Sequence, residues 1–188
     1  SFWYKRVLPT SGSSTSMVLN GNYLGSIKVP SSGTVQFFGD GASKYINFSG
    51  NVADGGWHHI LVYYPNGSTV DHTDVKCYID GTLSTNSYIG GSSSTGPVTM
   101  IQGTLIESVP IGVELSNWAY FLTNETSNID TIYNGGTPGD ISSLNPSVWL
   151  KYDSATTAFA GATGLEYGLA TDSSGNNNHL TPTNLVAS

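Results

Sequence analysis

Charged residues, basic residues above all, are scarce in this chain of 188 residues. Only 10% of the residues are charged and only six are Lys or Arg, whereas about a quarter of the residues in a typical soluble domain are charged. Long apolar runs are also missing, and none approaches the roughly 20 residues that a membrane-spanning helix needs. This composition excludes a basic nucleic-acid binder, a coiled coil and a disordered acidic tail. We therefore expect no nucleic-acid partner and no membrane insertion.

The acidic excess lies in the later part of the chain. Residues 1–80 hold five basic and five acidic side chains, so the whole net charge of −7 comes from residues 81–188. A negative surface repels the phosphates of nucleic acids and can attract a cation. The later part is therefore the place to look for a cation site.

Cysteine is almost absent as well. Cys77 is the only one, so the chain has no disulfide framework and no thiolate zinc site. Its place in the apolar alternation of Val75, Cys77 and Ile79 favours a small buried side chain over a reactive thiol. The chain starts with a strand-like run, without an initiator Met or the pattern of a signal peptide. We expect a processed product or an ordered piece of a longer polypeptide.

What the chain does contain is typical of strands and turns. Ser, Thr, Gly and Tyr are abundant, while Ala, Glu and Lys are few, which favours β-structure over helix. β-prone runs recur about every ten residues between turn residues, a spacing typical of a sandwich or barrel. The expected fold class is all-β, with strands over residues 2–8, 23–29, 34–38, 44–48, 57–64, 75–80, 98–101, 104–109, 117–122 and 148–152.

Turn residues and caps mark two local features. Asp80-Gly81 tolerates positive φ and predicts a tight hairpin after the strand at 75–80. One short helix is expected near residues 125–133, with Thr123 or Asn124 as its N-cap. The Asn-Gly-Gly sequence at 134–136 would end this helix in the left-handed region.

Three sequence elements resemble the laminin-G-like branch of the concanavalin-A-like lectin superfamily. They are GWHHI at 56–60 in a central strand, KCYIDG at 76–81 in the next hairpin, and YNGGTPGD at 133–140 after a short helix. The resemblance covers roughly residues 1–140 and implies an antiparallel two-sheet jelly-roll sandwich. It also implies that Trp57 packs between the sheets, and we expect Tyr78 and Ile79 in the same core.

The two ends of the chain resemble laminin-G-like modules in structural proteins of marine bacteriophages. The matching stretches are SFWYKR at 1–6 and DSSGNNNHLTPTNL at 172–185, and they imply a protein of a capsid, tail or fibre. The second motif commonly opens such a domain, whereas here it closes the chain. Because residues 1–140 alone would leave a sheet edge bare, we expect one domain over 1–188, with 1–140 as the main body and 141–188 folding back to complete the sheets. The alternative is that the last segment starts another module.

The residue pattern does not support an enzyme. A glycoside hydrolase needs two carboxylates that face each other across a cleft, and related β-glucanases carry them at alternate positions of one strand. The glutamates here have no acid two residues away, and a Gly-x-Ser-x-Gly elbow is missing. His58 and His59 are adjacent in a strand and point to opposite faces, so they cannot easily converge on one metal, and a zinc site is the less favoured interpretation. We expect one to support the core and the other to be solvated.

The motif at 172–178 is the best candidate for a metal site. Oxygen-bearing side chains alternate there, with Gly175 allowing a tight turn, and such a loop can wrap a hard cation such as calcium. Binding would need backbone carbonyls or a second acid such as Asp153. The alternative is an Asx-rich turn that satisfies its own backbone. The candidate calcium ligands are Asp172, Ser174, Asn176 and Asn178.

A lectin-type site would use exposed aromatic faces, and its candidates are Tyr64, Trp118 and Tyr120, although most strand aromatics belong to a core. Two functions follow. The first is a non-enzymatic structural module of a virion, attached to a capsid or tail, which contacts copies of itself or other virion proteins and adsorbs to a host surface or glycan. The alternative is a secreted carbohydrate-binding or adhesion module of a cellular organism. Both place the chain on a virion surface or outside the cell.

Overall fold

The computed structural model describes residues 1–6, 16–19, 26–38, 45–65, 72–89, 113–151 and 172–178. These residues form mostly antiparallel β-sheet with one short α-helix, in agreement with the all-β class. None of the described helices is long and apolar enough to cross a membrane. The strands expected at 98–101 and 104–109 lie outside the described residues.

Residue contacts divide the chain into two units. One is Tyr4–Glu114, and the other combines Ser1–Trp3 with Leu115–Ser188. The division falls within two strands, β1 (Phe2–Arg6) and β10 (Val113–Ser116). Residues 115–140 group with the C-terminal segment, and the expected organisation as one domain with a main body over 1–140 stays a prediction.

The first sheet has five strands in the order β10-β1-β6-β7-β8. Its later strands are β6 (Trp57–Tyr63), β7 (Lys76–Ile79) and β8 (Thr82–Leu83). β6 and β7 are antiparallel, with Ile60 opposite Ile79. The turn from β7 to β8 holds Asp80 at φ +51° and Gly81 at φ +76°, the left-handed backbone that these residues tolerate. The Asp-Gly hairpin is therefore confirmed.

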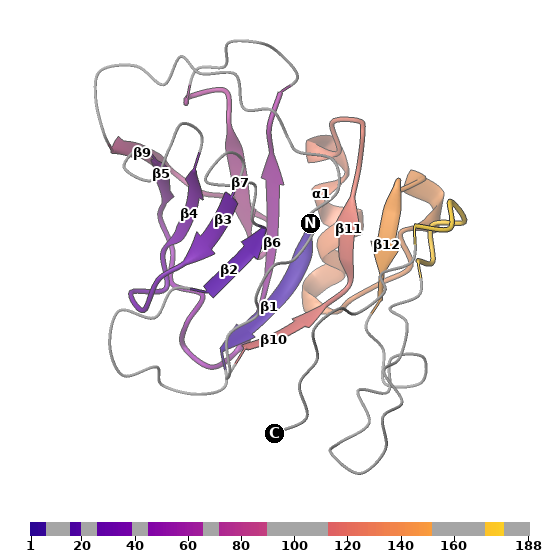
Figure 1. The fold of residues 1–188 in the computed structure, drawn as a ribbon, viewed down its shortest axis with the longest axis horizontal. Coiled ribbons are helices and arrows are strands. Elements are labelled where there is room, and N and C mark those ends of the chain that lie inside the picture. The colour runs from indigo at the N-terminus through magenta and orange to yellow at the C-terminus, as the bar shows by residue number, and fades with distance from the viewer. Residues whose placement is uncertain are drawn as a thin grey trace. The chain divides into compact units, whose positions relative to one another are not determined.

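The second sheet is also antiparallel, in the order β2-β3-β4-β5-β9 (Figure 1). Its strands are β2 (Ser16–Leu19), β3 (Ser26–Val29), β4 (Val35–Phe38), β5 (Tyr45–Phe48) and β9 (Asn86–Ile89). Side chains alternate between its two faces. One face buries Ile27, Val29, Val35, Phe37, Ile46 and Phe48. The other carries a half-buried polar row made of Lys28, Gln36 and Asn47.

The centre of β6 is buried on both faces, because His59, Ile60 and Leu61 are consecutive and all buried. Cys77 of β7 is buried too, and burial raises the pKa of its thiol, which confirms the expected apolar role. Arg6 of β1 is buried and donates to the backbone oxygens of Val29 (2.9 Å) and Pro30 (3.1 Å) at the end of β3.

In the unit that holds the later part of the chain, β11 (Trp118–Tyr120) pairs antiparallel with β12 (Val148–Leu150). A 3-10 turn at Thr126–Asn128 leads into α1 (Ile129–Tyr133), which ends at Asn134 with φ +48°. The side chain of Asn124 accepts the Thr126 N–H at 3.1 Å. A short helix within 125–133 and its left-handed end at Asn134 are confirmed, but the expected N-cap at Thr123 or Asn124 is wrong, because a 3-10 turn comes first and the N-cap of α1 is Asn128. Further 3-10 turns cover Asn134–Gly136 and Ser142–Leu144.

The C-terminal segment returns to β12. Asp172 forms an isolated antiparallel bridge with Leu150, and the Ser173 N–H donates to the Trp149 oxygen at 2.7 Å. β12 thus has β11 as one partner and residues 172–173 as another.

Candidate functional site

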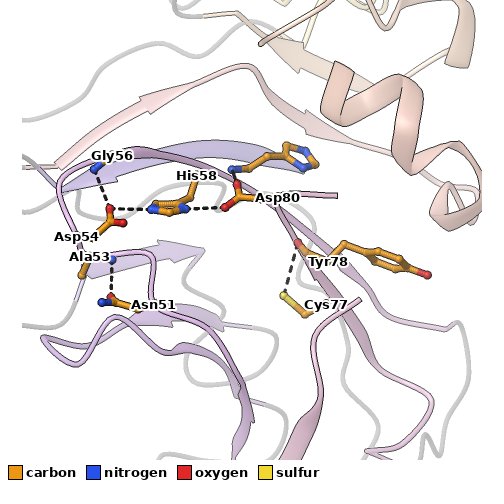
Figure 2. A network of polar contacts seen from close by, with 9 residues as sticks. Asn51, Ala53, Asp54, Gly56, His58, Cys77, Tyr78 and Asp80 are labelled. Carbon is orange, nitrogen blue, oxygen red and sulfur yellow. Dashed lines mark hydrogen bonds and ion pairs between the residues drawn. The ribbon is translucent and has the colours of Figure 1, made fainter. Parts of the chain in front are cut away.

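The strongest cluster of chemically active side chains in the described residues lies around His58, the second residue of β6. Its Nε2 lies 2.8 Å from Oδ1 of Asp54, and its Nδ1 lies 2.8 Å from Oδ2 of Asp80. Figure 2 shows the imidazole between the two carboxyl groups. The imidazole is mostly buried, whereas both carboxyl groups reach solvent. We call these three residues the His58 cluster.

The backbone fixes Asp80 at several points. Its Oδ1 accepts the His59 N–H at 2.9 Å, and its own N–H donates to the His59 oxygen at 3.0 Å. The left-handed φ of Asp80 belongs to the hairpin turn. The carboxyl group is therefore held where β6 and β7 end their pairing, with Oδ2 facing His58.

Asp54 is held more simply, by the loop that precedes β6. Its Oδ1 accepts the Gly56 N–H at 2.8 Å, and three residues earlier Oδ1 of Asn51 accepts the Ala53 N–H at 3.0 Å. Both are side-chain turns of the kind that Asp and Asn favour. They shape the loop so that Asp54 reaches the imidazole four residues later.

Electrostatics distinguish the two adjacent histidines. Burial alone lowers the pKa of His58, but its hydrogen bonds to Asp54 and Asp80 and their charges outweigh burial and raise that pKa above 6.5. The hydrogen bonds from His58 and Gly56 lower the pKa of Asp54. Burial instead lowers the pKa of His59 to about 3. The prediction that one histidine supports the core is confirmed for His59, whereas the prediction that the other is solvated is wrong, because the His58 side chain is only 13% exposed and lies between two carboxyl groups.

This arrangement leaves the imidazole of His58 no nitrogen with which to activate a nucleophile. A general base must contact the group from which it takes a proton, and here each nitrogen contacts a carboxylate. Two hydrogen bonds to carboxylates hold a ring in place and favour its charged form. The cluster is thus built to fasten the loop before β6 to the turn after β7.

The predicted calcium loop is described at residues 172–178. Both oxygens of the buried Asp172 carboxylate accept hydrogen bonds: Oδ1 from the N–H groups of Trp149 (2.8 Å) and Ser174 (2.9 Å), and Oδ2 from the Ser174 hydroxyl (2.7 Å) and the Asn178 N–H (2.9 Å). These bonds outweigh the effect of burial, which by itself raises the pKa of Asp172, and the net pKa is lowered.

The amides of the same loop point their donors at backbone oxygens. The Nδ2 atoms of Asn176 and Asn178 donate to the oxygen of Ser147 at 3.1 and 2.9 Å. They tie the loop to Ser147, whereas the contact expected of the alternative, an Asx-rich turn that satisfies its own backbone, is that of the Ser174 N–H with Oδ1 of Asp172. The described residues contain no group of three or more His, Cys, Asp or Glu side chains that could hold a metal ion. Calcium binding stays a prediction.

The predicted core position of Trp57 is wrong. Trp57 is the first residue of β6 and is 43% exposed, and the buried centre of the strand begins two residues later. Nζ of Lys5 lies 5.6 Å from the centre of its ring and 3.4 Å from Oε2 of Glu114. Tyr78 and Ile79 are half-buried.

The predicted glycan-binding aromatics are not exposed surfaces. Trp118 is only 2% exposed, so its assignment to a ligand site is wrong, because both faces of its ring are covered by protein. Tyr64 and Tyr120 are half-buried. The ring centre of Tyr64 lies 5.6 Å from that of Phe37. Among the residues whose burial is described, Trp57 is the exposed aromatic, and the sequence did not single it out for binding.

Sequence reasoning also missed the His58 cluster. Its signals were present, because Asp54 and His58 are four residues apart and Asp80 begins an Asp-Gly turn. The missing information was the pairing of β6 with β7, which brings residues 22 positions apart together. Comparisons with family models, curated proteins and solved structures found no match.

Proposed function

We propose that this chain is a non-enzymatic structural module of a virus particle. The observation that carries the proposal concerns the His58 cluster and the loop at 172–178. In both, the carboxylates and the imidazole make hydrogen bonds that hold turns and strands in place. Side chains of a catalytic type therefore serve the fold. A location on a capsid or tail is proposed from the resemblance of both ends to phage structural modules.

The finer fold in this proposal is a jelly-roll sandwich made from the two five-stranded sheets. It is supported by the period-two burial of β3, β5 and residues 35–37 of β4, which leaves one apolar face for a second layer. It is also supported by Arg6 of the first sheet, which donates to backbone oxygens at the end of β3 in the second. Such a module contacts copies of itself or other structural proteins through its polar surface.

The test is the assembly state of the purified chain. Sedimentation velocity and negative-stain electron microscopy over a range of concentrations should reveal an oligomer with closed symmetry, since structural modules of particles work in symmetric copies. A chain that stays monomeric at every concentration would contradict the proposal.

A second candidate function is carbohydrate binding, and the exposed Trp57 favours it. An exposed indole beside a carboxylate and an ammonium group can stack on a sugar ring and hydrogen-bond its hydroxyls, and Lys5 and Glu114 supply these charged groups. A glycan array followed by calorimetry tests it. Trp57→Ala should abolish binding, whereas Leu83→Ala, at a 53% exposed apolar position of β8, should not. Binding that persists in Trp57→Ala would exclude this site.

A further inference from the structure

The His58 cluster has a definite proton requirement. Each ring nitrogen lies 2.8 Å from a carboxylate oxygen, and an ionised carboxylate can only accept hydrogen bonds. Both contacts can be hydrogen bonds at once only if both nitrogens carry protons, which is the imidazolium form. A neutral imidazole has one N–H and one lone pair, so one of its nitrogens would face a carboxylate oxygen lone pair to lone pair.

The two contacts differ in how firmly their carboxylates are held. Asp80 makes two further hydrogen bonds with the backbone of His59: its Oδ1 accepts the His59 N–H, and its own N–H donates to the His59 oxygen. Asp54 lies in a loop, its side chain is 55% exposed against 36% for Asp80, and its other bond is to the neighbouring Gly56. Repulsion is relieved most easily where the partner can move into water. The contact between His58 and Asp54 is therefore the one that opens.

We propose that the His58 cluster links two segments in a pH-dependent way. The protonated imidazole bonds both to Asp54, in the loop before β6, and to Asp80, in the turn after β7. Loss of its proton breaks the bond to Asp54 and releases the Asp54–Gly56 loop. Trp57 is the next residue after Gly56 and is exposed, so release of the loop changes the solvent exposure of its indole. The device operates in any of the functions considered above, because it depends only on these contacts.

The neighbouring elements bring other charged groups, and these have their own described contacts. Lys5 of β1 lies at Glu114 and over the ring of Trp57, and Arg6 donates to backbone oxygens of residues 29 and 30. Lys76 of β7 is exposed and pairs in register with Tyr63, at the far end of β6. His59, on the opposite face of β6, stays neutral because burial lowers its pKa. The described charges that contact His58 are thus the two carboxylates, and their combined effect raises the pKa of His58.

The experiment titrates the unmodified chain from about pH 5 to about pH 9, a range centred near the ordinary histidine pKa. Nuclear magnetic resonance of the imidazole nitrogens should give a midpoint for His58 above 6.5, with protons on both nitrogens below it. Quenching of Trp57 by acrylamide should change at the same midpoint. The other three tryptophans are at most 3% exposed, and Trp57→Phe should remove the pH-dependent part of the signal.

Matched variants separate this pH-dependent link between His58 and Asp54 from a general effect of charge. Asp54→Asn should lower the His58 midpoint toward 6.5, because it removes one of the two negative charges and leaves the exposed loop intact. Asp74→Asn removes an exposed carboxylate outside the cluster and should leave the midpoint unchanged. A His58 midpoint at or below 6.5 in the unmodified chain would overturn the proposal. So would acrylamide quenching of Trp57 that stays constant through the His58 titration.

Discussion

At the scale of single residues, Asp172 shows what one carboxylate can hold together. Its oxygens accept three backbone N–H groups and one hydroxyl, and these donors come from β12 and from the loop that returns to it. A buried carboxylate with this many donors is stable only as the charged acceptor. The residue therefore fastens the C-terminal segment.

Replacing Asp172 by Asn should destabilise the fold by about 1–3 kcal/mol, the usual cost of leaving a buried polar group unsatisfied. The new NH₂ group would face the Asn178 N–H, a donor against a donor. Urea unfolding monitored by circular dichroism measures the change. The control is Asp140→Asn, because Asp140 is exposed and its Oδ1 accepts the Ser142 N–H. Equal losses in the two variants would contradict the role given to Asp172.

The unmodified chain and the Asp172→Asn variant also test the calcium prediction. Thermal unfolding in excess EDTA and in millimolar calcium should give a higher midpoint with calcium only if an ion binds at the loop, and Asp172→Asn should then remove the rise. With all four described contacts of the carboxylate made by protein donors, an ion would have to displace some of them. An unchanged midpoint would support the self-satisfied turn instead.

At the scale of elements, Trp57 and Trp149 show that two strand tryptophans can contribute very differently. Trp57 begins β6 and is exposed, whereas Trp149 is central in β12 and buried. The Nε1–H of Trp149 donates to Oδ1 of Asn117 at 3.1 Å, and Lys151 lies over its ring at 4.3 Å.

Trp149→Ala should therefore cost about 3–5 kcal/mol, as expected for a large buried aromatic. Trp57→Ala should cost no more than about 1 kcal/mol, the scale of an exposed contact such as that with Lys5. Chemical denaturation of both variants gives the comparison. A loss in Trp57→Ala as large as in Trp149→Ala would mean that Trp57 is a core residue after all.

Sequence reasoning succeeded at this scale where the signal is local. The Asp80-Gly81 turn, the left-handed stop at Asn134 and the opposite faces of His58 and His59 each depend on one or two neighbouring residues. Trp57 failed because its place was inferred from a resemblance, while its exposure depends on where β6 starts within the sheet. The His58 cluster needed a strand pairing that links distant residues, which one sequence does not reveal.

At the scale of the whole molecule, pH acts on stability through both histidines, in different ranges. The raised pKa of His58 gives a contribution that is complete below about pH 6.5 and is lost as the pH rises through the folded-state pKa. The pKa of His59, lowered to about 3, acts in the opposite direction. Below about pH 6.5 the unfolded chain gains a proton at this residue while the folded chain does not, so stability falls as the pH falls.

Between about pH 5.5 and pH 4.5, His58 is protonated in both states and most carboxylates are ionised in both, so His59 should dominate. The free energy of unfolding should fall by about 1.4 kcal/mol over this one pH unit. Urea unfolding at several pH values measures the slope. His59→Leu places an apolar side chain that cannot titrate in the buried position and should flatten the slope. If His59→Leu is too unstable to measure, His59→Gln replaces it. His58→Gln should keep the slope, since the charge state of His58 does not change between folded and unfolded chains in this range. A slope that survives the loss of His59 would assign the acid sensitivity to other groups.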